Sequence, residues 1–322
     1  MKKLRKNFSL YCLFFIIGAN LPSYSQGHYP GGYFNPNDYF VPPPGIILPV
    51  YYVYNNFNYY NNNGDKSDII ESGSSNTDTE LNIEQNVKTN SFVLMMLYGG
   101  KKKIGEFQWG FMVIPTVNNP SSTIALNYYS TQTGNGTVSF NNKTWGFGDL
   151  YIQPIWLSLV KKDWSFAMSY GVWLPTGKYK YNDIDNVGLG YYSHNFRVAS
   201  RYKPNSNIGI TGAITYETNQ IQKDSDFKEA PHLTFDYGAC YTWLLGHEVG
   251  LYGNYTTQLE EDKNNPNLYS KDQAWNVGAY GSYWLKPGKI GVLSRISQNF
   301  GEKNRYGGFT FTVGLNFLFL NQ

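Results

Sequence analysis

The stretch "GFTFTVGLNFLFL" at residues 307–319 decides the fold class of this 322-residue chain. Its residues alternate between two kinds of side chain. One parity carries Phe309, Phe311, Val313, Leu315, Phe317 and Phe319, and the other carries Thr310, Thr312, Gly314 and Asn316. Because successive side chains of a strand point to opposite faces, the stretch predicts a β-strand with one apolar face. The rest of the chain must show what that apolar face contacts.

The composition favours extended structure. The chain contains 29 Tyr, 20 Phe and 8 Trp together with 33 Gly, whereas charged residues make up only 15%. Aromatic side chains suit a pleated surface, and glycine is a poor helix former. An all-β chain is therefore expected.

The N-terminus has the pattern of a secretory signal peptide. Four basic residues, Lys2, Lys3, Arg5 and Lys6, precede a short apolar run at 8–19, and small residues follow at 23–25. The apolar run is shorter than the ~20 residues that a spanning helix needs. We expect residues 1–25 to be a signal peptide and the mature chain to begin near Gln26.

Removing that peptide changes the charge and the cysteine count. Four of the 26 Lys and Arg residues lie in it, which leaves 22 against 23 Asp and Glu, so the mature chain is nearly neutral. A nucleic-acid partner, which requires a clustered basic surface, is not expected. Cys240 is the only cysteine outside the signal peptide, which excludes a disulfide framework and a thiolate metal site within one chain.

Segments of period two recur along the mature chain, and we expect twelve strands. They are placed approximately at 46–58, 85–98, 103–116, 145–160, 164–174, 191–203, 207–218, 231–245, 248–260, 272–286, 289–300 and 307–320. The connections alternate between short turns and longer segments rich in Asn, Asp, Gly and Ser. The longer ones are expected at 59–84, 117–144, 175–190, 219–230, 261–271 and 301–306.

This alternation predicts a transmembrane up-and-down antiparallel β-barrel of about 12 strands, with tight turns at one rim and long loops at the other. A soluble β-sandwich or propeller is the alternative, but strands there are usually ~5 to 6 residues long. Lipid is then the partner of the apolar parity, and the outer membrane is the expected location. The barrel is expected over 46–322, after an N-terminal segment at 26–45 that either hangs in the periplasm or folds partly into the lumen.

The second parity of each strand is expected to face the lumen, and it carries charges of both signs. As the candidate solute path we single out eight residues: Glu106, Gln108, Asp149, Asn195, Arg197, Arg201, Asp236 and Arg295. Gln153, Thr234 and Asn276 share this parity. Such charges can pair across a narrow lumen and stiffen it, or they can form a constriction that screens a solute. Twelve strands favour a substrate-sized channel or cavity over a wide pore.

An enzyme is not expected. No nucleophile elbow, zinc-protease, phosphate-loop or dinucleotide motif occurs, and neither a cofactor nor a metal site is predicted. The four histidines are His28, His194, His232 and His247. His194 and His232 are both expected near the long-loop rim, where solvated histidines are favoured over a metal or catalytic pair.

Several short motifs resemble, in their order, the outer-membrane proteins of the family named for a MetA pathway of phenol degradation. They are "HYPGG", "DYFVPPPG", "GFGDLYIQPIWLSL" (146–159), "WLPTGKY" (173–179), "NVGLGYYS" (186–193) and "HLTFDYGACYTW" (232–243). The resemblance runs from about residue 28 to the end. Its most specific pieces are Gly148-Asp149 with Pro154 and Pro175-Thr176-Gly177. It implies an outer-membrane barrel associated with uptake of small, often aromatic or hydrophobic, compounds.

The chain departs from the usual pattern at its end, where Asn321 and Gln322 follow the last apolar residue. We therefore expect the outer-membrane assembly machinery to recognise Phe317 and Phe319. The function expected from the sequence is passive uptake of a small organic solute across the outer membrane. Two alternatives are a surface interaction protein that works through its long loops and a hydrolase acting at the rim.

Overall fold

The computed structural model describes residues 27–29, 31, 35–72, 79–130, 135–181, 186–265 and 271–320. The expected signal peptide at 1–25 lies outside these residues. The described chain contains one short 3-10 helix, η1 (Leu244–Gly246), and seventeen strands. The strands are β1 (Gly45–Tyr60), β2 (Ser67–Ser72), β3 (Thr79–Leu94), β4 (Met96–Ile104), β5 (Phe107–Ile114), β6 (Thr116–Ser130), β7 (Gly136–Lys143), β8 (Gly146–Phe147), β9 (Leu150–Val160), β10 (Trp164–Leu174), β11 (Ser193–Tyr202), β12 (Ile208–Asn219), β13 (His232–Thr242), β14 (Glu248–Gln258), β15 (Gln273–Lys286), β16 (Ile290–Lys303) and β17 (Arg305–Leu320).

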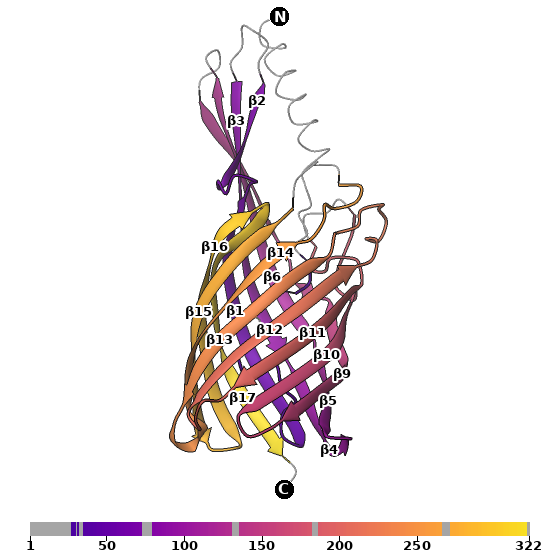
Figure 1. Ribbon diagram of the computed structural model, residues 1–322. Helices are drawn as coiled ribbons and strands as arrows, with labels where there is room; N and C mark the ends of the chain where they lie inside the picture. The colour runs from indigo at the N-terminus through magenta and orange to yellow at the C-terminus, as the bar shows by residue number, and fades with distance from the viewer. Residues whose placement is uncertain are drawn as a thin grey trace, which may run out of the picture.

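These strands close into a twelve-stranded antiparallel barrel, which confirms the predicted fold class (Figure 1). Three of the twelve wall strands are interrupted. The first consists of β3 and β4, the second of β5 and β6, and the third of β7, β8 and β9. The seam joins the two ends of the barrel, since β1 pairs with β17 from Gly45↔Leu320 to Tyr60↔Arg305. The other edge of β1 pairs with β3 and β4. Closure leaves neither β1 nor β17 with an open edge, as a sheet in lipid requires.

Burial in this barrel is inverted relative to a soluble protein. On β11, Asn195 and Arg197 are 1% and 6% exposed, whereas Phe196 and Val198 are 50% and 56% exposed. The deciding stretch follows the same rule, with Phe309 and Phe319 exposed and Thr312 buried. A closed wall with an apolar exterior and a polar interior is stable only when hydrocarbon surrounds it, so the protein is an integral outer-membrane barrel. Within the described residues, no helix has the length and apolarity needed to cross a membrane.

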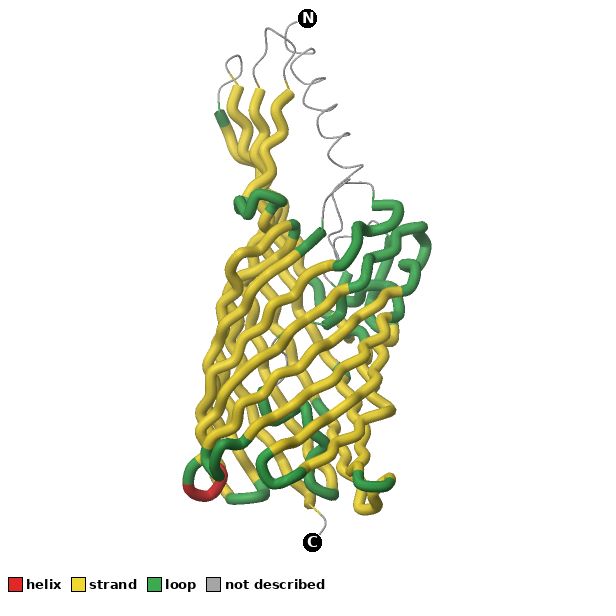
Figure 2. The backbone as a smooth tube through the Cα atoms, in the orientation of Figure 1, coloured by secondary structure: helices red, strands yellow, loops and turns green. Residues whose placement is uncertain are grey.

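The two rims differ as expected. One rim has only tight turns, and both Gly45 and Leu320 end there, while the other rim carries the extended connections (Figure 2). Aromatic side chains gather toward the strand ends. Near the short-turn rim the exposed ones include Trp164, Tyr202, Tyr241, Trp243 and Tyr283. Amphipathic rings collect at headgroup level, which is consistent with this placement.

The expected loops at 59–84 and 117–144 were wrong in part, because both contain strands. In the structure β2, the start of β3, β6 and β7 form a sheet that rises beyond the long-loop rim (Figure 1). Ile124 and Leu126 are buried there against Ile83 and Tyr128. This small apolar cluster stabilises strands in a segment whose composition alone indicates a loop. The expected loop at 301–306 is also wrong, since Asn304 alone separates β16 from β17.

Pro154 interrupts the hydrogen-bond ladder on both sides of β9. The register with β5 shifts between Gly110 and Met112, and the register with β10 shifts between Tyr170 and Val172. Proline has no backbone N–H to donate, so a strand tolerates it where the ladder bulges.

A charge on the lipid face should impair the barrel. We expect Val198→Arg, in the middle of β11, to cost about 2 to 4 kcal/mol of folding free energy in a bilayer, because arginine is poorly tolerated near the midplane. Unfolding in denaturant, followed by heat-modifiable migration on a gel, measures this cost. Val198→Leu is the matched control, and equal stability of the two variants would contradict the assignment of this face to lipid.

Candidate functional site

The described part of the N-terminal segment contacts inward-facing side chains along the lumen. Toward the long-loop rim, the backbone N–H groups of His28 and Tyr29 donate to the two carboxylate oxygens of Glu217, at 2.8 and 2.9 Å. The hydroxyl of Tyr29 donates to Asp236 at 2.9 Å. All four side chains are at most 9% exposed. Charge-assisted bonds of this kind are stronger than neutral ones, so this end of the segment is firmly held.

The other end of the segment lies near the short turns. There the backbone N–H of Val41 donates to Ser158 at 2.8 Å, and Gln108 donates to the carbonyl oxygen of Pro42 at 2.6 Å. Tyr39, Phe40 and Val41 are each 5–6% exposed. They pack into the main apolar cluster of the barrel interior, which also includes Trp156 and Met112. Residues 35–43 therefore fill the short-turn half of the lumen.

Two of the predicted arginines contact aromatic rings of this segment. Arg197 lies 4.8 Å from the ring centre of Tyr29 and 5.6 Å from that of Tyr39. Arg201 lies 4.5 Å from the ring centre of Phe40. A guanidinium over an aromatic face is attractive, and more so when it is desolvated. The inward arginines thus stabilise the segment in the lumen.

Asp149 closes an interruption in the barrel wall. The wall strand is broken between Phe147, the last residue of β8, and Leu150, the first residue of β9. One carboxylate oxygen of Asp149 accepts from the N–H of Gly177 at 2.8 Å. The other accepts from the N–H of Leu189 at 2.7 Å and contacts His28 Nε2 at 2.8 Å. A single buried carboxylate thus connects the wall, the loop between β10 and β11, and the N-terminal segment.

His28 lies between Asp149 and Ser193, which resembles the order of groups in a hydrolase triad. Ser193 Oγ lies 2.6 Å from His28 Nδ1, but it also donates to Asn219 Oδ1 at 2.6 Å. The amide nitrogen of Asn219 donates elsewhere, to the carbonyl of Ala230. Ser193 Oγ is therefore shared between the imidazole and the amide oxygen of Asn219. Ser193 is also fully buried, so this arrangement holds the N-terminal segment and does not present the serine to a substrate.

The eight residues predicted to line the solute path do not all lie together. Seven of them lie on the inward side of the wall: Gln108, Asp149, Asn195, Arg197, Arg201, Asp236 and Arg295. Five of the seven contact the N-terminal segment through hydrogen bonds or cation–π contacts: Gln108, Asp149, Arg197, Arg201 and Asp236. Asn195 donates to Glu217 at 2.8 Å. Arg295 lies over the ring of Tyr252 at 4.5 Å. Glu106 is exposed in the turn between β4 and β5, where it pairs with Lys161 at 3.0 Å, so it does not line the lumen.

Beside the N-terminal segment, the lumen encloses a cavity of about 360 Å³. Its lining mixes aromatic and apolar side chains, such as Trp173 and Tyr252, with amides and hydroxyls, such as Asn254 and Asn276. Asp149, Arg295 and Arg305 contribute charged groups, and His28 contributes its imidazole ring. A concave site that combines apolar side chains with placed polar groups is typical of small-molecule binding.

Glu217, Trp173 and Asn254 were missed as candidate site residues. Glu217 has the same parity as Thr215 on its strand, so the alternation could have included it. Asn254 likewise has the same parity as the buried Tyr252 and Thr256 on β14. No sequence pattern indicates that Glu217 accepts from the backbone of His28, because that contact joins residues 189 positions apart.

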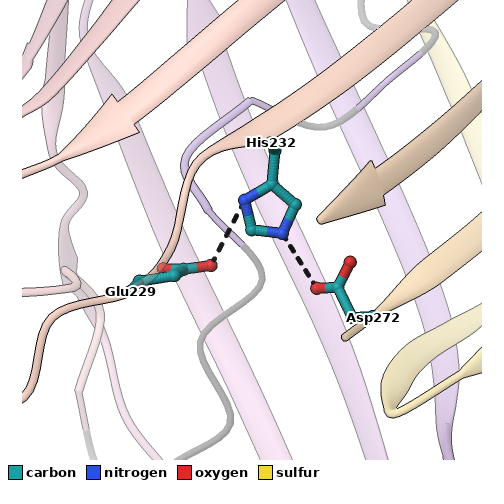
Figure 3. Close-up of side chains that lie close together, drawn as sticks. All are labelled: Glu229, His232 and Asp272. Atoms are coloured by element: carbon teal, nitrogen blue, oxygen red, sulfur yellow. Dashed lines mark hydrogen bonds and ion pairs between the residues drawn. The ribbon is translucent and has the colours of Figure 1, made fainter. Parts of the chain in front are cut away.

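A cluster of ionisable groups lies at the long-loop rim (Figure 3). His232 Nε2 lies 3.0 Å from Asp272, and His232 Nδ1 lies 3.8 Å from Glu229. These ligand atoms lie within 4.8 Å of one another, as a metal site would require. The two carboxylates, however, face opposite nitrogens of the ring, and Arg305 contacts both oxygens of Asp272 at 3.0 Å.

The rim cluster is better described as an ion-pair network that connects loops. Burial opposes ionisation of Asp272, but Arg305 and His232 together hold the pKa of that carboxyl below its usual value. Tyr191 donates to Glu229, so the network joins the three loops that precede β11, β13 and β15. His194 takes no part in it, because it faces outward and contacts the hydroxyl of Tyr170 at 2.9 Å. The considered pair of His194 and His232 therefore does not form.

The fold and the lumen together define an outer-membrane β-barrel with an internal segment and an enclosed cavity. The family described as "Putative MetA-pathway of phenol degradation" matches residues 64–315, and the chain belongs to this family. This confirms the resemblance found in its motifs. A search of curated protein sequences finds no match.

Several solved structures are similar in fold. An outer-membrane channel from Pseudomonas putida F1 is 14% identical, with a TM-score of 0.61, over 89% of this chain and 100% of that one. The CymD monoaromatic hydrocarbon channel is 9% identical, with a TM-score of 0.45, over 87% of this chain and 90% of that one. A FadL homologue from Pseudomonas aeruginosa is 9% identical, with a TM-score of 0.39, over 88% and 93%. At these identities the likeness concerns the fold alone.

Removing the Asp149 carboxylate should loosen the loop between β10 and β11. In Asp149→Ala the N–H groups of Gly177 and Leu189 lose a charged acceptor, and each such bond is worth about 1.5 to 3 kcal/mol. We expect trypsin to cleave after the exposed Lys178 and Lys180 at least tenfold faster than in the unmodified protein. Asp163→Ala, in a short turn, is the control. Unchanged cleavage in Asp149→Ala would show that Asp149 does not hold the loop.

Proposed function

We propose that this protein is a passive outer-membrane channel for small, largely apolar organic compounds, aromatic ones included. The observation that carries the proposal is the cavity of about 360 Å³ in the lumen, whose lining combines aromatic and aliphatic side chains with amides, hydroxyls and a few charged groups. That volume suits a small molecule and is too small for a peptide or an oligosaccharide. Family membership supports the class of compound, as do the outer-membrane barrel and the channels of similar fold.

The N-terminal segment is proposed to control passage. Residues 35–43 fill the short-turn half of the lumen, whereas the cavity lies beside Gly27, His28 and Gly31 toward the other rim. A solute would enter from the long-loop side and reach the periplasm when the segment moves. Many of the contacts that hold the segment are hydrogen bonds and cation–π contacts, which water can replace at low net cost.

The inward polar and charged residues that contact the segment would then form the solute path. Gln108, Arg197, Arg201 and Asp236 contact the segment in the structure, and displacement of the segment would leave them facing the passage. Because both signs of charge are present, the passage would favour uncharged solutes over ions. The outer-membrane assembly machinery is the other proposed partner, with Phe317 and Phe319 of β17 as the contact.

A surface interaction function remains the second candidate. It is supported by the sheet of β2, β3, β6 and β7, which projects beyond the rim and has its own apolar cluster at Ile124 and Leu126. A protein that only passes solutes does not need such a sheet. Deletion of this sheet without loss of solute passage would separate the two functions. A rim hydrolase is not proposed, because His28 and His232 are held in the networks described above and His194 faces outward.

Solute influx tests the channel directly. In proteoliposomes we expect small uncharged aromatic compounds to enter faster than in protein-free vesicles. Disaccharides should enter at the protein-free rate, because they are much larger than these compounds and more strongly hydrated. Influx is measured by vesicle swelling or by solute-dependent fluorescence. An absence of influx for every compound would exclude the channel and favour the surface interaction function.

A reversible cross-link tests the N-terminal segment. The amide nitrogen of Asn37 lies 4.0 Å from the sulfur of Cys240, so Asn37→Cys places two thiols close enough to join. We expect oxidation to reduce solute influx at least tenfold and reduction to restore it. Asn37→Cys combined with Cys240→Ala is the matched control and should not respond to oxidation. Equal influx in the oxidised and reduced forms would show that the segment need not move.

A further inference from the structure

Two asparagines face each other in the wall of the lumen cavity. Asn254 on β14 is paired in register with Asn276 on β15, and both line the cavity. They are 3% and 4% exposed. Among the described residues, neither Asn254 Nδ2 nor Asn276 Oδ1 has a hydrogen-bond partner. A buried donor and a buried acceptor thus lie side by side with their bonding capacity unused.

Such a pair is unusual in a folded protein. Most buried polar side-chain atoms have a partner, and an unsatisfied one destabilises the fold. Asn219, another inward amide, follows this rule, since its oxygen accepts from Ser193 and its nitrogen donates to the carbonyl of Ala230. The pair of Asn254 and Asn276 is therefore suited to a group that comes from outside the chain.

The space around the pair is also prepared for a ligand. Ala274, two residues before Asn276 on the same face, is small and lines the same cavity. Gly31 of the N-terminal segment packs against Asn254, where an added Cβ would lie 2.4 Å from Oδ1. The nearest aromatic side chain on this face of β14 is Tyr252, and Trp173 lines the cavity as well. Gly31 thus lets the segment backbone lie close to Asn254, Ala274 leaves room beside the two amides, and aromatic rings supply apolar contact.

We infer that Asn254 and Asn276 form a recognition site for the uncharged hydroxyl group of a small, otherwise apolar solute, which rests on the proposed channel function. The oxygen of such a hydroxyl group accepts a hydrogen bond from Asn254 Nδ2, and its O–H donates a hydrogen bond to Asn276 Oδ1. One hydroxyl group therefore satisfies both amides. A hydrocarbon satisfies neither group. A carboxylate has only acceptors, and it would place negative charge against the oxygen of Asn276. The site thus selects hydroxylated compounds over both hydrocarbons and acids.

Equilibrium binding to the mature protein in nanodiscs tests this inference, with empty nanodiscs subtracted. The probes are benzyl alcohol, benzyl methyl ether, ethylbenzene and benzoate, which differ in the polar group on a similar skeleton. We expect benzyl alcohol to bind about tenfold more tightly than the ether, because the ether lacks the donor. Ethylbenzene and benzoate should bind more weakly than the alcohol.

The double variant Asn254→Leu with Asn276→Leu should lose the preference for the alcohol while still binding ethylbenzene. Asn118→Leu is the matched control, because Asn118 lines the same cavity but already donates to Thr116, and it should keep the preference. Heat-modifiable migration verifies that each variant is folded.

Three results would overturn the inference: equal affinity for the alcohol and ethylbenzene, tighter binding of benzoate, or a preference that persists in the double variant. If the alcohol binds with the expected preference but no probe enters proteoliposomes, the channel function fails and the recognition site stands.

Discussion

The structure depends on the need to satisfy every backbone hydrogen bond of a sheet that lies in hydrocarbon. Each unpaired N–H or carbonyl in lipid costs several kcal/mol, so the sheet must close. Closure is achieved where β17 pairs with β1 along sixteen residue pairs. It also reverses the usual distribution of side chains, because lipid surrounds the barrel and the polar groups have to be accommodated inside. The polar lumen and the segment that fills it both follow from that reversal.

A polar interior that lacks bulk water needs partners for its charges, and the N-terminal segment supplies many of them. Glu217, Asp236 and Asp149 each contact the segment through a hydrogen bond, and Arg197 and Arg201 contact its aromatic rings. The arrangement has a consequence for function. A segment held by many polar contacts is stable in place, and the proposed gating requires that water replace those contacts when the segment moves.

Asp149 shows how a short motif can combine structural roles. It lies where the wall strand is broken, and its carboxylate replaces the missing ladder with bonds to Gly177 and Leu189. The same carboxylate binds His28. The motifs Gly148-Asp149 and Pro175-Thr176-Gly177 are distant in sequence and meet here. Loop closure and seating of the N-terminal segment therefore depend on the same carboxylate, so a change at Asp149 affects both.

The sequence by itself determined the membrane barrel, its twelve strands and the face that each strand turns to lipid, because these follow from alternation with period two and from the lengths of the connections. The parity of Asn195, Arg197 and Arg295 was correct for the same reason. The prediction from parity failed at Glu106, because Glu106 lies in the turn between β4 and β5 next to Gly105, which has a positive φ of 60°. It also failed at Ile124 and Leu126, where a local apolar cluster makes strands out of an expected loop. Only the tertiary structure decided what the inward groups contact, which of them remain without a partner, and that residues 27–29, 31 and 35–42 lie among them. Most contacts with that segment join residues more than a hundred positions apart, and they arise only when the closed barrel brings the two parts of the chain together.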